Sequence, residues 1–208
     1  IDGLRDFGVY TRDSFNYESV QVLKGPSSQI FGRGTTGGGI NTQSKTPILD
    51  TFAAATASIG NGSYYRAVAD TNYQIDNTTA LRVNMMFHNQ DIAGRDLVKS
   101  DRWGIAPTIG LGIGTDTVFT LAFLHQQDDR IPDYGIPTLI PPGQTISRPV
   151  TETTSIDRST FYGFSRDYDD TTADIVTAKF QHAQNDWLVL YNDARVGIYS
   201  RDFSGTRV

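Results

Sequence analysis

The sequence contains one glycine pattern that could bind a nucleotide. Residues 32–37 read Gly-Arg-Gly-Thr-Thr-Gly, which matches the GxGxxG fingerprint of dinucleotide-binding proteins. That fingerprint needs a helix after it, because the helix N-terminus presents amides to the pyrophosphate. Residues 38–41, Gly-Gly-Ile-Asn, cannot open a stable helix, and residues 25–28 lack the Gly-Lys-Ser/Thr ending of a phosphate-binding loop. The pattern therefore disfavours nucleotide binding.

Other side chains that commonly do chemistry are present without a suitable arrangement. The three histidines, His88, His125 and His182, stand alone in separate segments, so the sequence predicts no metal site. The aspartates at 128–129 and 167–170 lack the spaced oxygen ligands of a calcium loop. No Ser-His-Asp or paired-carboxylate arrangement can be argued from spacing, and the chain has no cysteine for thiol catalysis. We expect neither an enzyme nor a directly bound cofactor.

The composition favours strands and loops. Asp outnumbers Glu 21 to 2 and there are 20 glycines in the 208 residues, whereas Lys, a strong helix former, occurs four times. A net charge of −5 gives no general basic field, so nucleic acid is not an expected partner. No run approaches the roughly 18 apolar residues of a membrane helix. A transmembrane β-barrel remains compatible, because its strands show only short alternating segments.

From residue 51 onward, apolar and polar side chains alternate with a period of two, which is typical of strands with two different faces. In the clearest segment, every second side chain from Trp103 to Ile113 is apolar, and those between are small or polar. The pattern predicts seven strands. Their expected boundaries are residues 52–60, 64–75, 79–90, 102–113, 117–128, 172–184 and 187–201.

The connections between these strands alternate in length. Tight turns are expected at 76–78, 114–116 and 185–186, and long loops near 91–101 and 130–171. In an antiparallel meander this parity gathers the long loops at one end, as in outer-membrane barrels. Ten residues at roughly 3.3 Å each, tilted by about 40°, cover about 25 Å, the height of the apolar band of such barrels. Seven strands do not close a barrel of the usual even count, so we expect the sequence to be an excerpt.

Residues 18–47 carry an ordered series of short motifs. They read Glu-Ser-Val-Gln-Val-Leu-Lys-Gly-Pro-Ser-Ser at 18–28, Phe-Gly-Arg-Gly at 31–34, Gly-Gly-Ile-Asn at 38–41 and Ser-Lys-Thr-Pro at 44–47. The series resembles the plug signature of TonB-dependent outer-membrane receptors. Asp-Gly-Leu-Arg-Asp at 2–6 and Arg-Asp-Ser-Phe-Asn at 12–16 narrow the resemblance to siderophore receptors, and to ferric catecholate receptors in particular. Residues 43–44, Gln-Ser, depart from the apolar residue and Thr that are usual there.

The resemblance implies a mostly β fold: a 22-stranded antiparallel transmembrane barrel filled by an N-terminal plug, in the outer membrane of a Gram-negative bacterium. Residues 1–47 would be the C-terminal part of the plug, and residues 48–208 the first barrel strands with extracellular loops. The implied partners are a ferric siderophore, with catecholate favoured, outer-membrane lipid, and the TonB–ExbB–ExbD complex through a TonB box outside this sequence. Iron would travel as the chelate.

Two alternatives stay open from the sequence. The same kind of barrel could carry another cargo, such as cobalamin, haem or a glycan. The chain could also be a soluble β-rich binding module or enzyme, because a β-core of any kind contains aromatic residues such as Trp103, Tyr65 and Tyr73.

The resemblance also implies where cargo binds, at the plug apex and on the long loop. Arginine offers planar charged donors for catecholate oxygens, and aromatic rings stack on catechol rings. For each candidate the alternative is an exposed loop position or a contact between plug and barrel. The candidates are Arg5, Phe7, Tyr10, Arg12, Tyr134, Arg148, Phe161, Tyr162 and Arg166.

Two further sets of residues are expected to be structural. The polar strand faces should point inward and hydrogen-bond the plug; they carry Arg66, Asp70, Arg82, Asn84 and Arg102. The plug motif itself should form turns and close backbone contacts. Its residues are Glu18, Lys24, Gly25, Pro26, Gly32, Arg33, Gly34, Gly38, Gly39, Asn41, Lys45 and Pro47.

Overall fold

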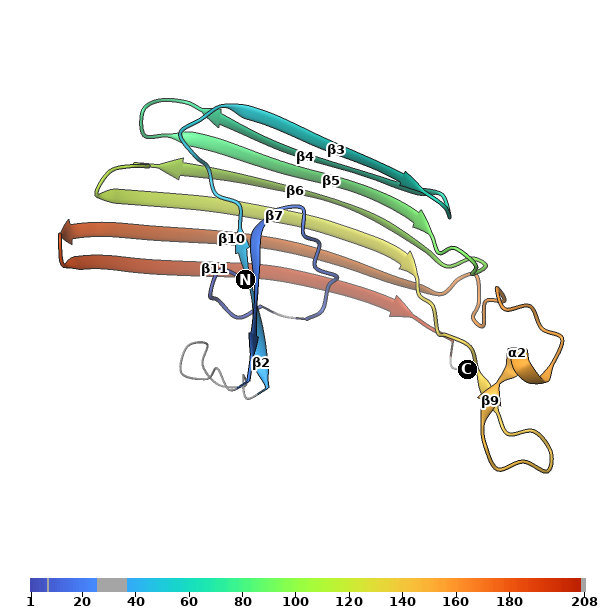
Figure 1. The fold of residues 1–208 in the computed structure, drawn as a ribbon. Coiled ribbons are helices and arrows are strands. Elements are labelled where there is room, and N and C mark those ends of the chain that lie inside the picture. Colours follow the sequence, from blue (N-terminus) through green and yellow to red (C-terminus); the bar gives the residue numbers. More distant parts are fainter. Residues whose placement is uncertain (7, 26–36, 207–208) are drawn as a thin grey trace.

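A computed structural model describes residues 1–6, 8–25 and 37–206, and the described chain is almost entirely β-structure (Figure 1). An N-terminal arm, residues 1–6 and 8–16, leads into an antiparallel hairpin of β1 (Tyr17–Lys24) and β2 (Gly38–Ser44). A seven-stranded sheet follows. The predictions at Phe7, Pro26, Gly32, Arg33 and Gly34 lie outside the described residues.

The sheet is a continuous antiparallel meander. Its order, β3-β4-β5-β6-β7-β10-β11, is the order along the chain, and all neighbours pair antiparallel. The seven predicted strands are confirmed, each overlapping one observed strand. The observed strands are β3 (Phe52–Gly60), β4 (Tyr64–Gln74), β5 (Ala80–Asp91), β6 (Lys99–Leu111), β7 (Thr117–Ile131), β10 (Tyr168–Asn185) and β11 (Leu188–Ser204).

The strand ends differ from the prediction in a systematic way. The pairs Lys99 with Ile131 and Tyr168 with Ser204 extend the ladder by three or four residues beyond the expected boundaries. Hydrophobic alternation could not reveal these extensions, because most of their side chains are polar on both faces of the sheet. In contrast β6 stops two residues early. Gly112, at φ +72°, turns the chain, and a Cβ there would lie 2.0 Å from the Thr117 carbonyl oxygen.

The long connections lie at one end of the sheet, which we call the loop end, and the tight turns lie at the other, except for the short first connection, 61–63, which is at the loop end (Figure 1). Residues 61–63, 92–98 and 132–167 are at the loop end. The last of these, the long loop, contains the short elements β8 (Thr138–Leu139), β9 (Arg148–Pro149) and α2 (Val150–Thr153). None of the helices in the described ranges is long and apolar enough to cross a membrane.

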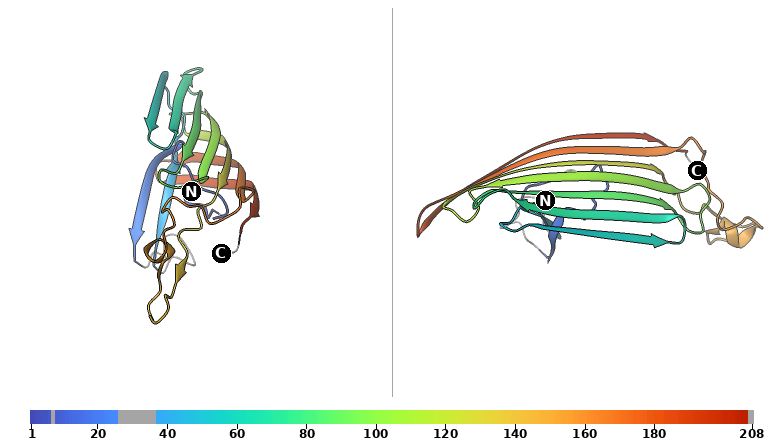
Figure 2. Two further views of the ribbon diagram at one scale, coloured as in Figure 1. Left: turned by 90° about the vertical axis from the view of Figure 1, so that its right-hand side faces the viewer. Right: turned by 90° about the horizontal axis from the view of Figure 1, so that it is seen from above.

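The two faces of the sheet differ in chemistry. One face of the curved sheet, the inner face, receives the arm, and the hairpin lies on the same side (Figures 1 and 2). Inner-face side chains such as Arg82, Asn84 and Thr108 are buried. The outer face exposes large apolar side chains, including Phe87 and Val196. Neighbouring methionines show the alternation: Met85 points outward and is 47% exposed, whereas Met86 points inward and is 3% exposed.

A glycine on the inner face gives the arm its closest approach. The ring of Phe15 packs with Met86 and Ala106 in a small buried cluster. A Cβ on Gly104 would lie 3.0 Å from the Phe15 ring and 3.1 Å from the His125 carbonyl oxygen. The small inward-facing residues of β6, Gly104 and Ala106, therefore leave room for the Phe15 ring of the arm.

Gly104→Ala should destabilise the folded protein by about 1–3 kcal/mol, because the added methyl group overpacks the Phe15 site. The measurement is the urea midpoint of unfolding in detergent. Gly60→Ala is the control, since a Cβ there meets Tyr64 at an ordinary 3.5 Å. Combining Gly104→Ala with Phe15→Leu should cost less than the two changes added together. Equal midpoints for the two alanine variants would contradict this account of the packing.

Candidate functional site

Asp13 of the arm is shared by two arginines of the sheet. Arg66 donates to both of its carboxylate oxygens at 2.6 and 2.9 Å, and Arg102 donates to Oδ2 at 2.9 Å. The backbone N–H of Phe15 adds a bond to Oδ1 at 3.1 Å. All three charged side chains are at least four-fifths buried. This geometry combines a bidentate pair with a second cation, so it fixes the arm in both position and direction.

The Asp13 carboxylate stays ionised in this setting. Burial opposes its ionisation, but the hydrogen bonds and charge of Arg66, with the charge of Arg102, outweigh burial and hold the pKa of Asp13 below its ordinary value. The ionised Asp13 carboxylate therefore lies between two guanidiniums, and Arg102 Nε also lies 3.6 Å from the carboxylate of Asp128.

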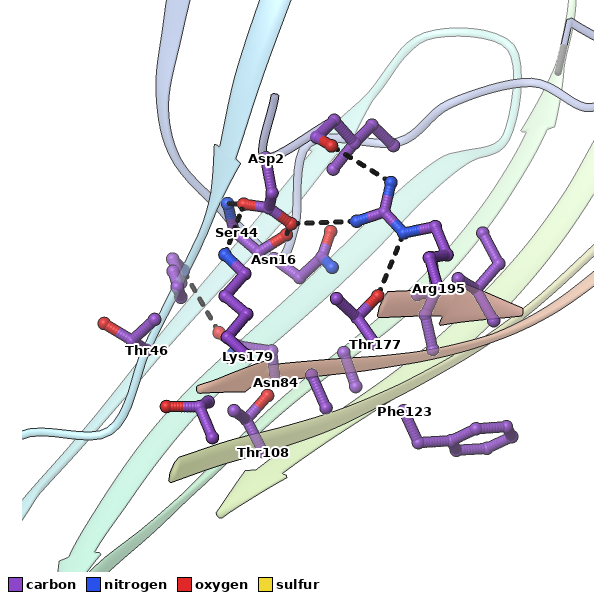
Figure 3. Close-up of a pocket in the computed structure, with 17 residues that line it drawn as sticks. Asp2, Asn16, Ser44, Thr46, Asn84, Thr108, Phe123, Thr177, Lys179 and Arg195 are labelled. Carbon is purple, nitrogen blue, oxygen red and sulfur yellow. Dashed lines mark hydrogen bonds and ion pairs between the residues drawn. The ribbon is translucent and has the colours of Figure 1, made fainter. Parts of the chain in front are cut away.

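Asp2 makes a second connection, between the arm, the hairpin and the far strands (Figure 3). Its carboxylate accepts bonds from the backbone N–H and hydroxyl of Ser44, both at 2.8 Å, from Lys179 at 3.1 Å and from Arg195 at 3.0 Å. Burial opposes ionisation, and the Ser44 and Lys179 contacts overcome it, so the pKa of Asp2 is lowered. Arg195 also donates to the carbonyl oxygen of Ile1 at 3.0 Å.

The space around Asp2 is lined by polar side chains on one part and by apolar ones, including Phe123, Leu124 and Ile175, on another. A cavity of about 40 Å³ lies between arm and sheet, with Asn16, Asn84, Thr108 and Lys179 among its lining residues (Figure 3). That volume accommodates about two or three water molecules, and Asn16 Oδ1 faces this region as a buried acceptor. The seam between arm and sheet is thus built from hydrogen-bonding groups that can also bind water.

Asp6 organises a third contact, which contains two of the predicted cargo residues. The Tyr10 hydroxyl donates to Asp6 at 3.0 Å, Arg12 Nε donates at 2.8 Å, and the Tyr199 hydroxyl donates from β11 at 3.0 Å. The rings of Tyr10 and Tyr199 stack with centroids 5.6 Å apart. Burial and the Asp6 charge raise the pKa of Tyr10, so its phenol remains a donor. These contacts join the arm to β11 of the sheet.

A further cationic cluster lies on the inner face near the loop end. Asp169 accepts from Arg201 at 2.7 and 3.2 Å and from Arg130 Nε at 2.9 Å, and Arg130 also reaches the Thr11 hydroxyl at 3.1 Å. Two guanidiniums against one carboxylate leave one net positive charge. The Arg201 side chain is 46% exposed, and its Cζ lies 5.3 Å from the Phe203 ring centroid. An exposed guanidinium beside an aromatic ring suits an anionic aromatic ligand.

The sequence did not reveal Arg130, Arg201 or Phe203 as site residues. Arg201 stands at the end of a predicted strand, whereas Arg130 and Asp169 stand in a predicted loop. Only the observed pairing brings them together, because Asp169 is opposite Phe203 and Thr171 is opposite both Asp128 and Arg201. One pattern in the sequence could have pointed to this cluster: arginine and aromatic residues alternate with other residues along the last strand, at Arg195, Tyr199, Arg201 and Phe203.

The predicted cargo residues fall into separate groups. Tyr10 and Arg12 meet at Asp6, and in the long loop the rings of Tyr134 and Phe161 lie 6.2 Å apart. The guanidinium of Arg95 lies 5.9 Å from the Tyr162 ring. The remaining three described candidates are exposed: Arg5, Arg148 and Arg166. Arg166 stacks on Phe164 and lines an open cavity of about 260 Å³ beside β6 and β7.

The described motif residues make backbone and inter-element contacts. Lys45 donates to the Phe15 carbonyl oxygen at 3.1 Å and to Asn84 at 3.2 Å, and it pairs with Asp70 at 3.0 Å. A Cβ on Gly38, at φ +127°, would lie 2.2 Å from the Leu23 carbonyl oxygen. The other positions are Glu18, 3.5 Å from Arg82; Lys24, Gly25 and Gly39 at the hairpin ends; Asn41, bonded to the Gly3 amide; and buried Pro47.

The inward orientation expected for five strand residues is what the structure shows. Arg66 and Arg102 bind Asp13, while Arg82 donates to the Thr46 carbonyl oxygen at 2.9 Å as well as to Asp70. A directly bound metal ion would need a group of side chains that could hold it. In the described ranges there is no group of three or more acidic or histidine side chains placed to do so.

The chain is similar to known receptors over its whole length. It is 41% identical over 212 aligned residues to the catecholate siderophore receptor Fiu of Escherichia coli O157:H7, an alignment that includes 100% of this chain and 28% of that protein. No family model matches. The chain therefore spans less than a third of the length of this curated relative.

Solved structures agree with the sequence comparison. The open form of the ferric-catecholate import receptor Fiu from E. coli K12 superposes with a TM-score of 0.88 at 40% identity, over 97% of this chain and 31% of that one. The siderophore receptor PiuA from Acinetobacter baumannii gives 0.89 at 31% identity, over 98% of this chain and 29% of that one.

Asp13→Asn should release the arm from the sheet at a cost of about 3 kcal/mol, because largely buried Arg66 loses its carboxylate partner and Arg102 keeps only Asp128, at 3.6 Å. We expect amide hydrogen exchange in residues 8–16 to accelerate at least tenfold. Asp50→Asn is the matched control, since the Asp50 side chain is exposed and its carboxylate accepts a bond from the neighbouring Thr51 amide rather than from an arginine. Indistinguishable exchange in the two variants would show that Asp13 does not hold the arm.

Proposed function

This chain belongs to the TonB-dependent outer-membrane siderophore receptors, and we propose that it forms the plug-to-barrel junction of a receptor that imports ferric siderophores, with catecholate chelates as the favoured cargo. Residues 1–47 are proposed to be the end of the plug, and residues 48–208 the first strands of the barrel wall. The observation that carries the proposal is the two-faced sheet, whose polar face binds the arm through Asp2, Asp6 and Asp13.

The chemistry of the two faces supports a position in the membrane. Large apolar side chains on the outer face, such as Phe87, Trp103 and Val196, are exposed in this chain and would be stable against lipid tails. The inner face offers charged and amide groups that a polar plug satisfies. With the plug entering from the periplasmic side, the loop end would face the cell exterior.

The cargo assignment rests on the kind of groups that face the interior near the loop end. Arg201 and Arg130 retain a net positive charge after pairing with Asp169, and Phe203 provides an exposed ring beside them. A ferric catecholate is anionic and aromatic, so both of its features have a counterpart there. The similarity to a receptor named for catecholate siderophores points the same way.

The receptor would then import the chelate without making or breaking covalent bonds. Long-loop aromatic residues meet the chelate, inner-face arginines bind it, and passage requires the polar seam between plug and wall to rearrange. We propose that the TonB–ExbB–ExbD complex supplies the energy for that step. The seam is suited to it, because water can replace each of its hydrogen bonds as the arm moves.

Binding of a chelate panel to the full-length receptor tests the cargo assignment. Ferric catecholate should bind tightly, and ferric hydroxamate, cobalamin and haem weakly. Arg201→Gln should weaken catecholate binding about tenfold, in line with the loss of one charged hydrogen-bonding partner. Arg158→Gln, which removes an exposed loop charge, is the control. Tight binding of cobalamin or haem alone would overturn the assignment, and unchanged affinity in Arg201→Gln would remove this cluster from the site.

Met85→Arg should reduce the amount of folded receptor in the outer membrane, because an arginine on the lipid face near mid-bilayer costs about 2–4 kcal/mol. Met85→Leu keeps the size and apolar character of the side chain and should assemble normally. The readout is the heat-modifiable folded band from isolated membranes. Normal assembly of Met85→Arg would argue against lipid contact on this face.

A further inference from the structure

Arg95 lies in the connection between β5 and β6, residues 92–98, at the loop end. The connection is closed by bonds from the Ile92 N–H to the Val98 carbonyl oxygen, 2.9 Å, and from the Arg95 N–H to the Ile92 carbonyl oxygen, 3.0 Å. An arginine in a surface turn is normally solvated. The side chain of Arg95 is only 11% exposed, because residues 133–135 and 158–162 of the long loop surround it.

The guanidinium of Arg95 uses all three of its nitrogens on the long loop. Nε and Nη2 donate to the two carboxylate oxygens of Asp133 at 3.0 and 2.7 Å. Nη2 also reaches the Gly135 carbonyl oxygen at 3.2 Å, and Nη1 reaches the Arg158 carbonyl oxygen at 3.1 Å. The Tyr162 ring lies 5.9 Å from Cζ. One side chain therefore joins two parts of the long loop that are more than twenty residues apart in sequence.

Neighbouring contacts reinforce this connection. The Asp96 N–H donates to the Ser159 carbonyl oxygen at 2.8 Å, and the Ser159 hydroxyl donates back to the Asp96 carboxylate at 3.1 Å. Burial opposes ionisation of Asp133, but its hydrogen bonds with Arg95 and the Gly135 amide lower its pKa, so it remains a carboxylate at neutral pH. Residues 92–98 and the long loop thus form one folded unit at the loop end.

We propose that Arg95 is a positioning residue for cargo capture: it fixes the long loop, in which the half-buried rings of Tyr134 and Phe161 lie 6.2 Å apart, in the conformation that meets an arriving ferric chelate. This inference rests on the proposed function. The planar fork of arginine is required, because lysine cannot make a bidentate carboxylate contact, reach two carbonyl oxygens and lie against a ring at once. A loop ordered before binding spares the chelate the entropy of ordering it.

The test has two readouts in the full-length receptor. Hydrogen exchange of residues 132–167 in the absence of cargo reports the position of the loop, and the concentration dependence of radioiron uptake from ferric catecholate reports capture. The variants are Arg95→Gln and Arg95→Lys. Arg158→Gln is the matched control, because it removes a charge from the same loop, whereas Arg158 contributes only its backbone carbonyl oxygen to the contact with Arg95.

We expect both Arg95 variants to accelerate loop exchange about tenfold and to raise the half-saturating chelate concentration about tenfold. The maximal uptake rate should stay within about twofold of wild type, and Arg158→Gln should resemble wild type in all three measurements. A receptor that was merely damaged would instead lose maximal rate.

Three results would overturn the inference. Unchanged exchange in Arg95→Gln would show that Arg95 does not position the loop. Faster exchange with an unchanged half-saturating concentration would separate the loop from capture. Wild-type behaviour of Arg95→Lys would show that a positive charge at position 95 is enough to hold the loop and that the planar guanidinium is not required. If wild-type receptor takes up no ferric catecholate, the proposed cargo is wrong, whereas the exchange data still decide the positioning role.

Discussion

The structure depends on one electrostatic constraint: a carboxylate of the arm has to be buried against a sheet whose inner face is lined with arginine. Asp13 meets this constraint because Arg66 and Arg102 stand in one cross-strand row, with His88 between them. Adjacent strands are about 4.8 Å apart, so two guanidiniums two strands apart converge on one carboxylate from either side. An uncompensated carboxylate or guanidinium in that position would be strongly destabilising.

The same constraint explains the composition of the strands. Every inner-face side chain must bind the arm, bind a neighbour on the sheet or leave room, whereas every outer-face side chain has only to be apolar. Arg82 illustrates the first case, since it binds Asp70 beside it and the Thr46 carbonyl oxygen above it. Gly104 illustrates the last, since it accommodates Phe15. The alternation of side chains along each strand thus reflects the different environments on the two sides of the sheet.

The fold could be predicted from the sequence because of this alternation. Period-two alternation identifies all seven strands and their inner faces, and the motif series at residues 18–47 identifies the family. The cluster of Arg130, Asp169 and Arg201 could not be predicted, because it depends on the register between β7, β10 and β11 beyond the apolar band. Alternation fixes which face a residue occupies but not which residue stands opposite it across a long loop.

A polar seam also reconciles firm attachment with movement. An apolar interface resists opening in proportion to its area, at about 25 cal/mol for each Å² exposed to water. In the seam between arm and sheet, Asp2, Asp6 and Asp13 bind partners that water could replace if the arm shifted, and the cavity of about 40 Å³ beside Asp2 has room for water. Each hydrogen bond to a charged group contributes about 1.5–3 kcal/mol net, so the bonds together define a single resting position. If the arm moves during import, as the proposed function requires, attachment through several replaceable ion pairs suits that movement better than a hydrophobic core would.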